Sequence, residues 1–308
     1  MPVRMAPKWR HRLSVFVCVL GYSVPAPGAE PPVVAASIAP VHALAAGVME
    51  GAGAPHLLIP AGASPHHHTL KPSKARQLSK ARVVFRISPH MESVLVRPLK
   101  ALADTALIID LIEAPDLTLR PFAGAVHAEH GDLKGHLEGH RGTDPHIWLD
   151  PRNAGAMVHA MAAALVGVDP GRTKLYRRNA KAMAARLRDL DHMLGRQLKA
   201  VAKQPYITFH DAYRYLEARY SLNNAGIVAV DPDRQPGARH IADIRRIFKA
   251  SNIRCIFTEP QFPPRLINTV TAGLMARVSV LDPIGTDSYF QMMQKLAGNL
   301  TDCLRGKN

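Results

Sequence analysis

Four residues that can bind a metal ion lie at positions where strands end or loops begin. They are His66, His146, His210 and Asp282. In open α/β sheets, ligands bind beyond the carboxyl ends of the strands, where loops converge without disturbing the core. Imidazole nitrogens and one carboxylate are ligand types of four-coordinate zinc. Because the chain contains 16 histidines, the prediction of a metal site rests on the positions of these four residues and not on residue type alone.

Each of the four residues also has an ordinary structural interpretation. A single histidine after a strand is often a surface residue or a hydrogen-bonded polar residue of the fold. Asp282 precedes Pro283, so it also suits the start of a turn or the cap of a helix. Glu259, at a further strand end, has two open interpretations, one facing a cleft and one holding its own loop. The four positions taken together favour a metal site over four unrelated structural roles.

The elements that would position these residues alternate between strands and helices. In the first half of the chain, strand-like runs at 33–38, 56–59, 82–87 and 106–109 accompany helix-like runs at 41–49 and 154–166. In the second half, strand-like runs at 205–209, 227–230, 254–257 and 277–281 alternate with helix-like runs at 213–219, 240–250, 264–276 and from 288 onward. This alternation predicts an α/β protein with a parallel, doubly wound sheet in each half.

One long amphipathic helix separates the two halves. Between Pro170 and Val201, apolar residues recur at spacings of three and four with charged residues between them, as expected for a helix with one buried face. At 1.5 Å per residue it would extend about 45 Å, enough to cross two lobes. We therefore expect an N-terminal α/β lobe over residues 30–168, a linking helix over 169–201 and a C-terminal α/β lobe over 202–308, with the metal site in the cleft between the lobes.

The first 29 residues have the pattern of a secretory signal peptide. Four cations, Arg4, Lys8, Arg10 and Arg12, precede an apolar stretch and a small-residue segment. We therefore expect cleavage near residue 30 and a soluble, exported protein. The formal charge of +15 falls to +11 without these four cations. The remaining cations are spread along helix-like segments without interleaved aromatic residues, so we expect no nucleic-acid partner.

Two cysteines, Cys255 and Cys303, follow the leader. An even pair in an oxidising compartment usually forms a disulfide, and such a bridge would stabilise the fold by roughly 3–4 kcal/mol on the loop-entropy model. Two buried free thiols are the alternative interpretation, and metal ligation by two such distant cysteines is a further one. The compartment favours the disulfide.

Six short motifs are distributed over the chain beyond the leader. They are 62–73 (GASPHHHTLKPS), 144–151 (DPHIWLDP), 210–213 (HDAY), 234–238 (RQPGA), 258–262 (TEPQF) and 281–283 (LDP). In this order, and over nearly the whole of the exported chain, the motifs resemble those of the periplasmic zinc-binding solute-binding proteins of ABC importers, the zinc branch of the cluster A-I metal-binding family.

This resemblance implies a ligand set of three histidines and one carboxylate, namely His66, His146, His210 and Asp282. Some zinc-type members have a glutamate directly before the first histidine, where this chain has Pro65. The resemblance therefore leaves Asp282 or a water molecule as the fourth ligand. Members that resemble manganese carriers have a glutamate at the third position, whereas this chain has His210. Three imidazoles favour zinc over manganese, although copper and nickel also suit such a site.

A segment rich in glycine and histidine interrupts the first half. Residues 123–142 lack periodicity, which predicts a surface loop. The loop holds four histidines with acidic residues between them, namely His127, His130, His136 and His140. Similar loops in zinc-type family members imply low-affinity capture of zinc and its delivery to the main site. The alternative is a solvated insertion whose histidines bind metal only incidentally.

The resemblance implies a monomeric carrier that is not an enzyme, binds Zn²⁺ in the periplasm and delivers it to the membrane permease of an ABC zinc importer. Three alternatives stay open, namely a secreted zinc-dependent hydrolase, a carrier for manganese or copper, and a metal-dependent adhesin. A catalytic zinc site also uses three histidines and a water. The chain, however, has neither an HExxH motif nor a serine nucleophile elbow, which favours the carrier.

Overall fold

The structure, a computed structural model, describes residues 30–65, 68–122, 142–229, 236–286 and 288–306. The chain separates into two units, Met1–Glu30 and Pro31–Asn308, and every helix and strand described lies in the second unit. Within these residues, no helix combines the length and the apolarity needed to cross a bilayer. The predicted signal peptide over residues 1–29 and residues 123–141 of the histidine-rich loop lie outside the described residues.

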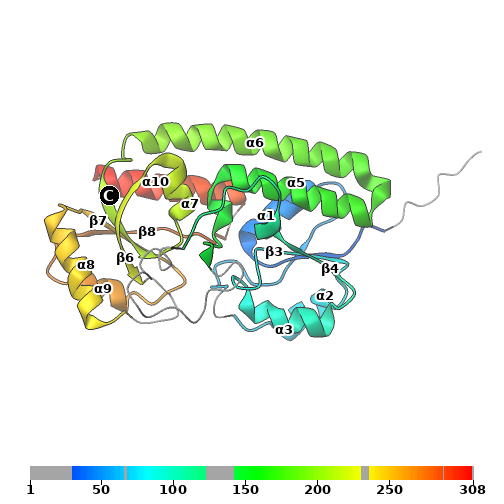
Figure 1. The fold of residues 1–308 in the computed structure, drawn as a ribbon, viewed down its shortest axis with the longest axis horizontal. Coiled ribbons are helices and arrows are strands. Elements are labelled where there is room, and N and C mark those ends of the chain that lie inside the picture. Colours follow the sequence, from blue (N-terminus) through cyan, green and yellow to red (C-terminus); the bar gives the residue numbers. More distant parts are fainter. Residues whose placement is uncertain (1–29, 66–67, 123–141, 230–235, 287, 307–308) are drawn as a thin grey trace, which may run out of the picture. The chain divides into compact units, whose positions relative to one another are not determined.

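The first half of the chain forms a parallel four-stranded sheet with helices on both faces. Its strand order is β2-β1-β3-β4, with β1 at Val34–Ala36, β2 at His56–Leu57, β3 at Val83–Arg86 and β4 at Leu107–Asp110. Helices α1 (Ala39–Val48) and α5 (Pro151–Val168) cover one face, and α2 (Pro72–Leu78) and α3 (Ser93–Leu102) cover the other (Figure 1). The central strands β1 and β3 are buried along their whole length, as parallel strands covered on both faces are.

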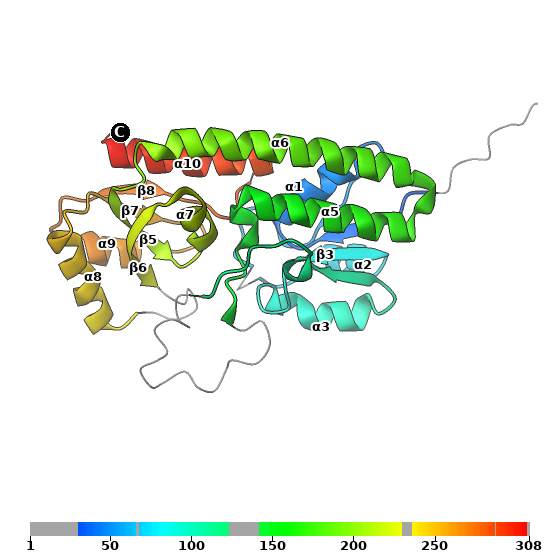
Figure 2. The same cartoon turned by 45° about the horizontal axis from the view of Figure 1, so that its top comes forward.

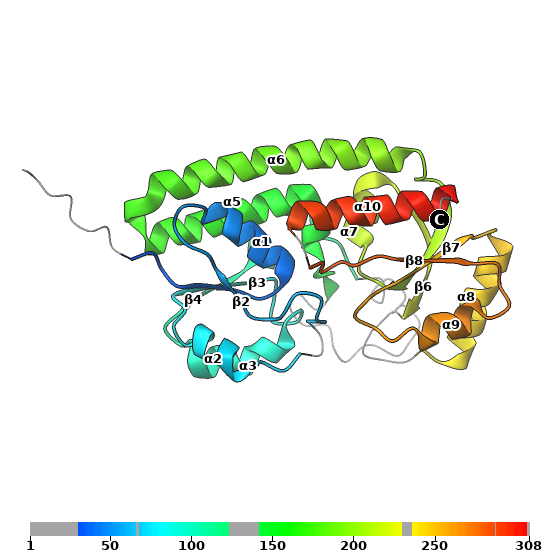
Figure 3. The same cartoon turned by 180° about the vertical axis from the view of Figure 1, so that it is seen from behind.

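The second half repeats this arrangement. Its strand order is β6-β5-β7-β8, with β5 at Pro205–His210, β6 at Asn223–Ala229, β7 at Cys255–Thr258 and β8 at Arg277–Val280. Helices α8 (Ala238–Ala250) and α9 (Arg265–Thr271) lie on one face, and α10 (Tyr289–Arg305) lies on the other (Figure 3). Cys255 and Phe257 join the core that includes α10, whereas Ile256 joins a separate apolar cluster under α8 and α9. This alternation follows from the two-residue period of a strand.

Helix α6 (Thr173–Lys199) links the two halves after a short 3₁₀ turn at Pro170–Arg172. It packs against α1 and α5 of the first half and against α10 and α7 (Arg214–Tyr220) of the second (Figure 2). Its 27 residues extend about 40 Å at 1.5 Å per residue. Two doubly wound α/β lobes joined by one long helix confirm the predicted fold class. The exact lobe boundaries at 30–168, 169–201 and 202–308 stay a prediction.

Three differences from the predicted elements have local causes. Helices α2 and α3 are not among the predicted helices, because α2 buries only Leu78 and α3 contains Pro98 in its interior. The helix predicted over 264–276 ends at Thr271, because Gly273 has a φ of 68°, which a right-handed helix does not continue. Strand β6 begins at Asn223, earlier than predicted, since its asparagines and glycine are poor strand formers that nevertheless pair with strand β5.

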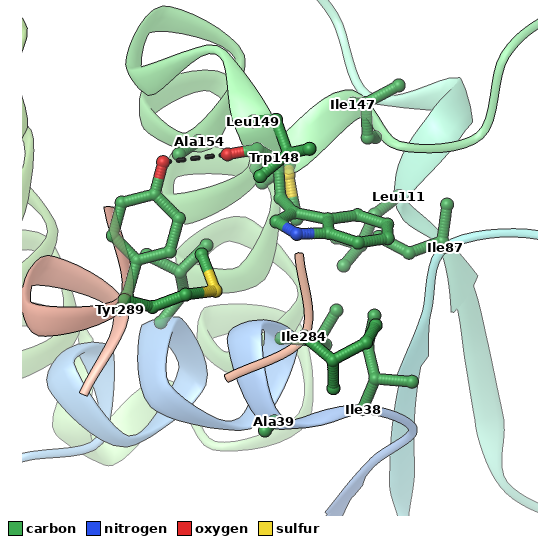
Figure 4. Close-up of a cluster of buried hydrophobic side chains, with 14 of the residues drawn as sticks. Ile38, Ala39, Ile87, Leu111, Ile147, Trp148, Leu149, Ala154, Ile284 and Tyr289 are labelled. Carbon is green, nitrogen blue, oxygen red and sulfur yellow. Dashed lines mark hydrogen bonds between the residues drawn. The ribbon is translucent and has the colours of Figure 1, made fainter. Parts of the chain in front are cut away.

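The two lobes share one apolar core around Trp148. This residue lies in the 3₁₀ turn η4 (Ile147–Leu149), which precedes α5, and its side chain is fully buried. Figure 4 shows the indole among residues of both lobes, including Ile38, Ile87 and Ile284. Trp148 donates its indole N–H to the carbonyl of Pro283 at 2.8 Å, and Tyr289 donates its hydroxyl to the carbonyl of Trp148 at 2.7 Å. Apolar contacts and two hydrogen bonds therefore tie the lobes together behind the cleft.

A disulfide joins the second sheet to the last helix. Cys255 in β7 and Cys303 in α10 are bonded, with their Cα atoms 6.1 Å apart. Both cysteines are buried. The predicted bridge is confirmed, and it anchors α10 on the face of the sheet opposite α8 and α9.

Candidate metal centre

His210 ends strand β5, and Glu259 directly follows the neighbouring strand β7. Because the two strands are parallel, their carboxyl ends meet at one edge of the sheet, and the two side chains come together there. The Nδ1 atom of His210 and the Oε1 atom of Glu259 lie 2.6 Å apart, and both residues are buried. Phe262 packs edge-on against the imidazole, with ring centroids 5.7 Å apart. The carboxylate accepts the Nδ1–H of His210 and leaves Nε2 as the nitrogen that can bind a metal.

His146 is held in the same way by a carboxylate two residues earlier. Asp144 Oδ1 accepts hydrogen bonds from the backbone N–H of His146 at 3.0 Å and from its Nδ1–H at 2.7 Å. The backbone of Asp144 is itself held, because its N–H donates to the carbonyl of Arg120 and its carbonyl accepts from the Tyr215 hydroxyl. Asp144 and His146 are both buried. This arrangement selects the tautomer of His146 that presents Nε2.

The two imidazoles meet at their Nε2 atoms, which lie 3.4 Å apart. Two nitrogen ligands of a tetrahedral zinc, each about 2.0–2.1 Å from the ion, would lie about 3.3–3.4 Å from one another. The observed separation therefore equals that of one edge of a tetrahedral zinc site. Each lobe contributes one of the two nitrogens, as the positions of His146 and His210 in the sequence predict.

Charge is distributed unequally over this pair. Burial, and next the neighbouring His210, lower the pKa of His146 to about 3, so His146 is a neutral imidazole at neutral pH. Burial by itself would lower the pKa of His210, but the Glu259 carboxylate outweighs it and the pKa of His210 is raised. Burial also raises the pKa of Asp144 to about 7. A proton on His210 therefore competes with a metal ion for this site.

A cavity of about 10 Å³ adjoins the two imidazoles. Loops from both lobes line it, through Ser64, Pro65, Met91, Glu259, Gln261, Phe262, Pro283 and Ile284. A single water molecule needs about 10–15 Å³, whereas small-molecule pockets measure about 300–1,000 Å³. The cavity therefore suits one monatomic ion better than an organic ligand.

Asp282 lies beside this cavity in a turn. Its Oδ1 accepts hydrogen bonds from the side-chain amide of Gln261 at 2.8 Å and from the backbone N–H groups of Ile284 and Gly285 at 3.1 and 2.9 Å. The turn that it stabilises places Pro283 and Ile284 on the cavity wall. Asp282 therefore stabilises a turn, which is one of the roles that its place before Pro283 suggested. Its Oδ1 accepts from these donors and not from the imidazoles.

Several predicted ligands fall outside the described residues. They are His66 of the main site and the loop residues His127, His130, His136 and His140. Within the described parts of the chain, no three histidine, cysteine, aspartate or glutamate side chains gather as a complete metal site. Of the predicted ligands, the structure describes His146, His210 and Asp282. Ser64 and Pro65, which directly precede His66 in the sequence, line the cavity.

The sequence did not point to Asp144 as a partner of His146, and for Glu259 it left two roles open, one facing a cleft and one holding its own loop. Asp144 lies two residues before His146, a spacing that allows a side chain to bind the following backbone N–H. Glu259 directly follows a strand that neighbours the His210 strand. The spacing of Asp144 and His146 is local and can be read from the DPH motif. The proximity of Glu259 to His210 follows only from the strand order.

Comparison with known proteins assigns the family. The sequence model of the family described as zinc-uptake complex component A, periplasmic (ZnuA) matches residues 34–303. The chain belongs to the ZnuA family. The high-affinity zinc uptake system protein ZnuA of Brucella abortus (strain 2308) is 35% identical over 309 residues, covering 88% of this chain and 91% of the relative. The protein of the same name in Yersinia pestis is 32% identical over 291 residues, covering 88% and 91%. The resemblance stated from the motifs is thereby confirmed.

Solved structures agree with the ZnuA assignment at the level of the fold. A crystal structure of ZnuA matches with a TM-score of 0.77 and 24% identity, covering 89% of this chain and 99% of the other. The periplasmic zinc-binding protein TroA from Treponema pallidum matches with a TM-score of 0.72 and 18% identity, covering 89% and 99%. Both likenesses confirm the two-lobed α/β architecture, and the ZnuA family is one of periplasmic components of zinc-uptake complexes.

Proposed function

We propose that this protein captures zinc in the periplasm and delivers it to the membrane permease of an ABC-type zinc importer. The observation that carries the proposal is the 3.4 Å separation between Nε2 of His146 and Nε2 of His210, which suits two ligands of one tetrahedral zinc. The names of the relatives, high-affinity zinc uptake system proteins, support the same ion.

His66 is the third ligand in this proposal, and Asp282 is the fourth. Ser64 and Pro65, which directly precede His66 in the sequence, line the cavity, and this supports the assignment of His66. Asp282 Oδ1 already accepts three hydrogen bonds, so the proposal assigns ligation to its Oδ2. A water molecule is the alternative fourth ligand.

Zinc is the preferred ion because of the ligand types. Three imidazoles and one carboxylate suit zinc, whereas manganese prefers more oxygen ligands. Copper binds nitrogen ligands more tightly than zinc in the general affinity order. Selection of zinc in the periplasm therefore depends on which ions are available as well as on the site.

A binding role is favoured over hydrolysis by the space and by the carboxylates. A zinc hydrolase needs room for a substrate and a general base near the metal-bound water. The cavity measures about 10 Å³. The buried carboxylates of Asp144 and Glu259 each accept a hydrogen bond from a proposed ligand, which engages them as orienting groups. We therefore propose that the protein is not an enzyme.

The histidine-rich loop is proposed as a capture segment for zinc. Its stem is a short antiparallel bridge between Pro121 and Thr143, with the N–H of Phe122 donating to the carbonyl of Gly142. Deleting residues 124–141 would leave this stem intact. We expect the deletion to reduce uptake at low zinc while one zinc per chain is retained. Unchanged uptake at low zinc would contradict the capture role.

Three further parts of the proposal concern processing and assembly. Residues 1–29 are removed as a signal peptide, the exported protein is a monomer, and it has no nucleic-acid partner. Mass spectrometry of the protein recovered from the periplasm tests the cleavage near residue 30. Light scattering on the same sample tests the monomer, and a dimer mass would contradict it.

Metal analysis of the exported protein tests the main proposal. We expect one tightly bound zinc per chain that excess manganese does not displace. The His146→Ala variant should lose it, whereas the control His159→Ala, which changes an exposed histidine on α5, should retain it. Substoichiometric zinc in the unaltered protein, or zinc retained by His146→Ala, would contradict the proposal. Zinc-dependent hydrolysis lost in Asp282→Asn would instead favour the hydrolase.

A further inference from the structure

The exposed face of helix α6 carries a row of cations. Eight basic residues of this helix are exposed, and all but Arg186 lie on one side of it. These seven are Lys174, Arg177, Arg178, Lys181, Arg188, Arg196 and Lys199. At about 100° per residue, all seven fall within an arc of about 100° that faces away from the buried side. The name basic stripe is used below for these seven residues.

Opposite charge is scarce along the basic stripe. Helix α6 has two acidic residues, Asp189 and Asp191. Asp191 is buried and accepts both arms of the Arg219 guanidinium and the Tyr220 hydroxyl, so its charge is already compensated. Asp189 is the single exposed acid of the helix. Within the part of the chain that the structure describes, no residue of the basic stripe forms an ion pair.

The N-terminal part of the basic stripe works against the stability of its own helix. Like charges at spacings of three or four residues, such as Lys174 with Arg178, repel one another. Lys174 in the first turn, where the helix has no acidic residue, also opposes the positive end of the helix dipole. Arg196 and Lys199 lie in the last turn, where cations favour the dipole. Because packing of the apolar face does not require the cations of the first turns, they fit an external partner of negative charge.

The geometry of the basic stripe suits an extended anionic surface. The stripe follows a single helix of about 40 Å, and α6 contributes no residue to the described lining of the metal cavity. A partner on the stripe therefore leaves the metal site accessible. A second copy of this chain is disfavoured, because two molecules with a formal charge of +15 in sequence, or +11 without the leader cations, repel one another.

We propose that the basic stripe of α6 docks the exported protein on the anionic phospholipid headgroups of a membrane leaflet that faces the periplasm. Juxtamembrane cations are attracted to such a surface within about a Debye length. Docking confines the carrier to a layer next to the membrane and raises its local concentration there. This function adds to metal capture and does not depend on zinc.

Co-sedimentation with vesicles tests the proposal with protein recovered from the periplasm. One set of vesicles contains equal parts of phosphatidylglycerol and phosphatidylcholine, and the other contains phosphatidylcholine alone. We expect binding to the anionic vesicles at low salt, little binding to the neutral ones, and release as the salt concentration rises. Replacing Lys174, Arg178, Lys181 and Lys199 by glutamine should lower partitioning by at least about 100-fold.

Two further variants separate the stripe from net charge and from misfolding. A matched control replaces four exposed cations elsewhere by glutamine, namely Arg239, Lys249, Arg254 and Arg265. Its partitioning onto anionic vesicles should fall less than about threefold, since these charges lie away from the docking face. The conservative variant with Lys174, Lys181 and Lys199 replaced by arginine should retain binding.

Three results would overturn the proposal of membrane docking. Equal losses in the stripe variant and the matched control, or no binding to anionic vesicles at low salt, would overturn the proposal. Binding to duplex DNA or to an acidic protein without binding to vesicles would also overturn it. Because vesicle binding is measured without a metal, failure of the docking proposal is distinguishable from failure of the zinc carrier proposal.

Discussion

The Nε2 atoms of His146 and His210 lie 3.4 Å apart, although the residues are 64 positions apart in sequence and belong to different lobes. Each imidazole is held from behind by a buried carboxylate. Hydrogen bonds within the protein therefore hold the two nitrogens in an arrangement that suits one metal ion, and such held ligands cost less to order on binding.

Zinc affinity should fall as the pH is lowered, because a proton competes for His210. The Glu259 carboxylate raises the pKa of His210 above its ordinary value of 6.5, so without a metal this histidine keeps its proton to a higher pH than an unperturbed histidine. Below that pKa, each pH unit should lower zinc affinity about tenfold for the one proton displaced. Competition with a chelator of known affinity between pH 5.5 and 8 measures this, and a flat affinity below pH 6.5 would contradict it.

Replacing Glu259 by glutamine should weaken zinc binding without removing a ligand. The variant loses the charge that orients His210 and raises its pKa, and loss of such an orienting group lowers metal affinity about 10–100-fold. The acid limb of the affinity profile should also move to lower pH, since a neutral amide no longer raises the pKa. Glu50→Gln, at an exposed position, is the control and should match the unaltered protein in both measurements.

Glu92 should be a major contributor to stability. Its fully buried carboxylate accepts hydrogen bonds from the Ser37 hydroxyl and from the backbone N–H groups of Ile87 and Ser88. Glu92→Ala would leave these three donors without an acceptor, and it should lower the free energy of unfolding by about 3 kcal/mol or more. Denaturant titration measures the change, with Glu50→Ala as control. A loss below about 1 kcal/mol would contradict the role.

The pH dependence of stability should reveal the same carboxyl group. Burial raises the pKa of Glu92 above its ordinary value of 4.5, so the folded protein binds this proton more tightly than the unfolded chain. The resulting contribution to stability is fully present below about pH 4.5 and is lost as the pH rises through the folded pKa. The difference in stability between the unaltered protein and Glu92→Ala, measured by denaturant titration from pH 4 to pH 8, should therefore shrink as the pH rises.

Removal of the Cys255–Cys303 disulfide should lower stability by about 4 kcal/mol on the loop-entropy model, because the bridge closes a loop with a sequence separation of 48. The double variant with both cysteines replaced by alanine should unfold at lower denaturant. A reductant should shift the unaltered protein towards the variant and leave the variant unchanged. An equal response of both proteins to reductant would mean that the bridge does not provide this stability. Zinc stoichiometry should be retained, since neither cysteine lines the cavity.

The sequence by itself determined the two α/β halves, the long helix and the positions of the proposed ligands. These features depend on local patterns, namely apolar runs for the strands, a helical period between residues 170 and 201, and polar residues where strands end. The motifs also determined the family, because they occur in order along the chain. These patterns do not predict helices α2 and α3, because α2 buries a single leucine and α3 contains a proline.

Only the tertiary structure decided which side chains meet. Glu259 reaches His210 because β7 pairs with β5, and strand order is a long-range property that no local pattern contains. Asp282 turns its Oδ1 towards Gln261 and two backbone N–H groups, since a carboxylate at the start of a turn binds the nearest donors. The 3.4 Å approach of the two imidazoles depends on how the lobes pack around Trp148, and such packing is the sum of many contacts between residues distant in sequence.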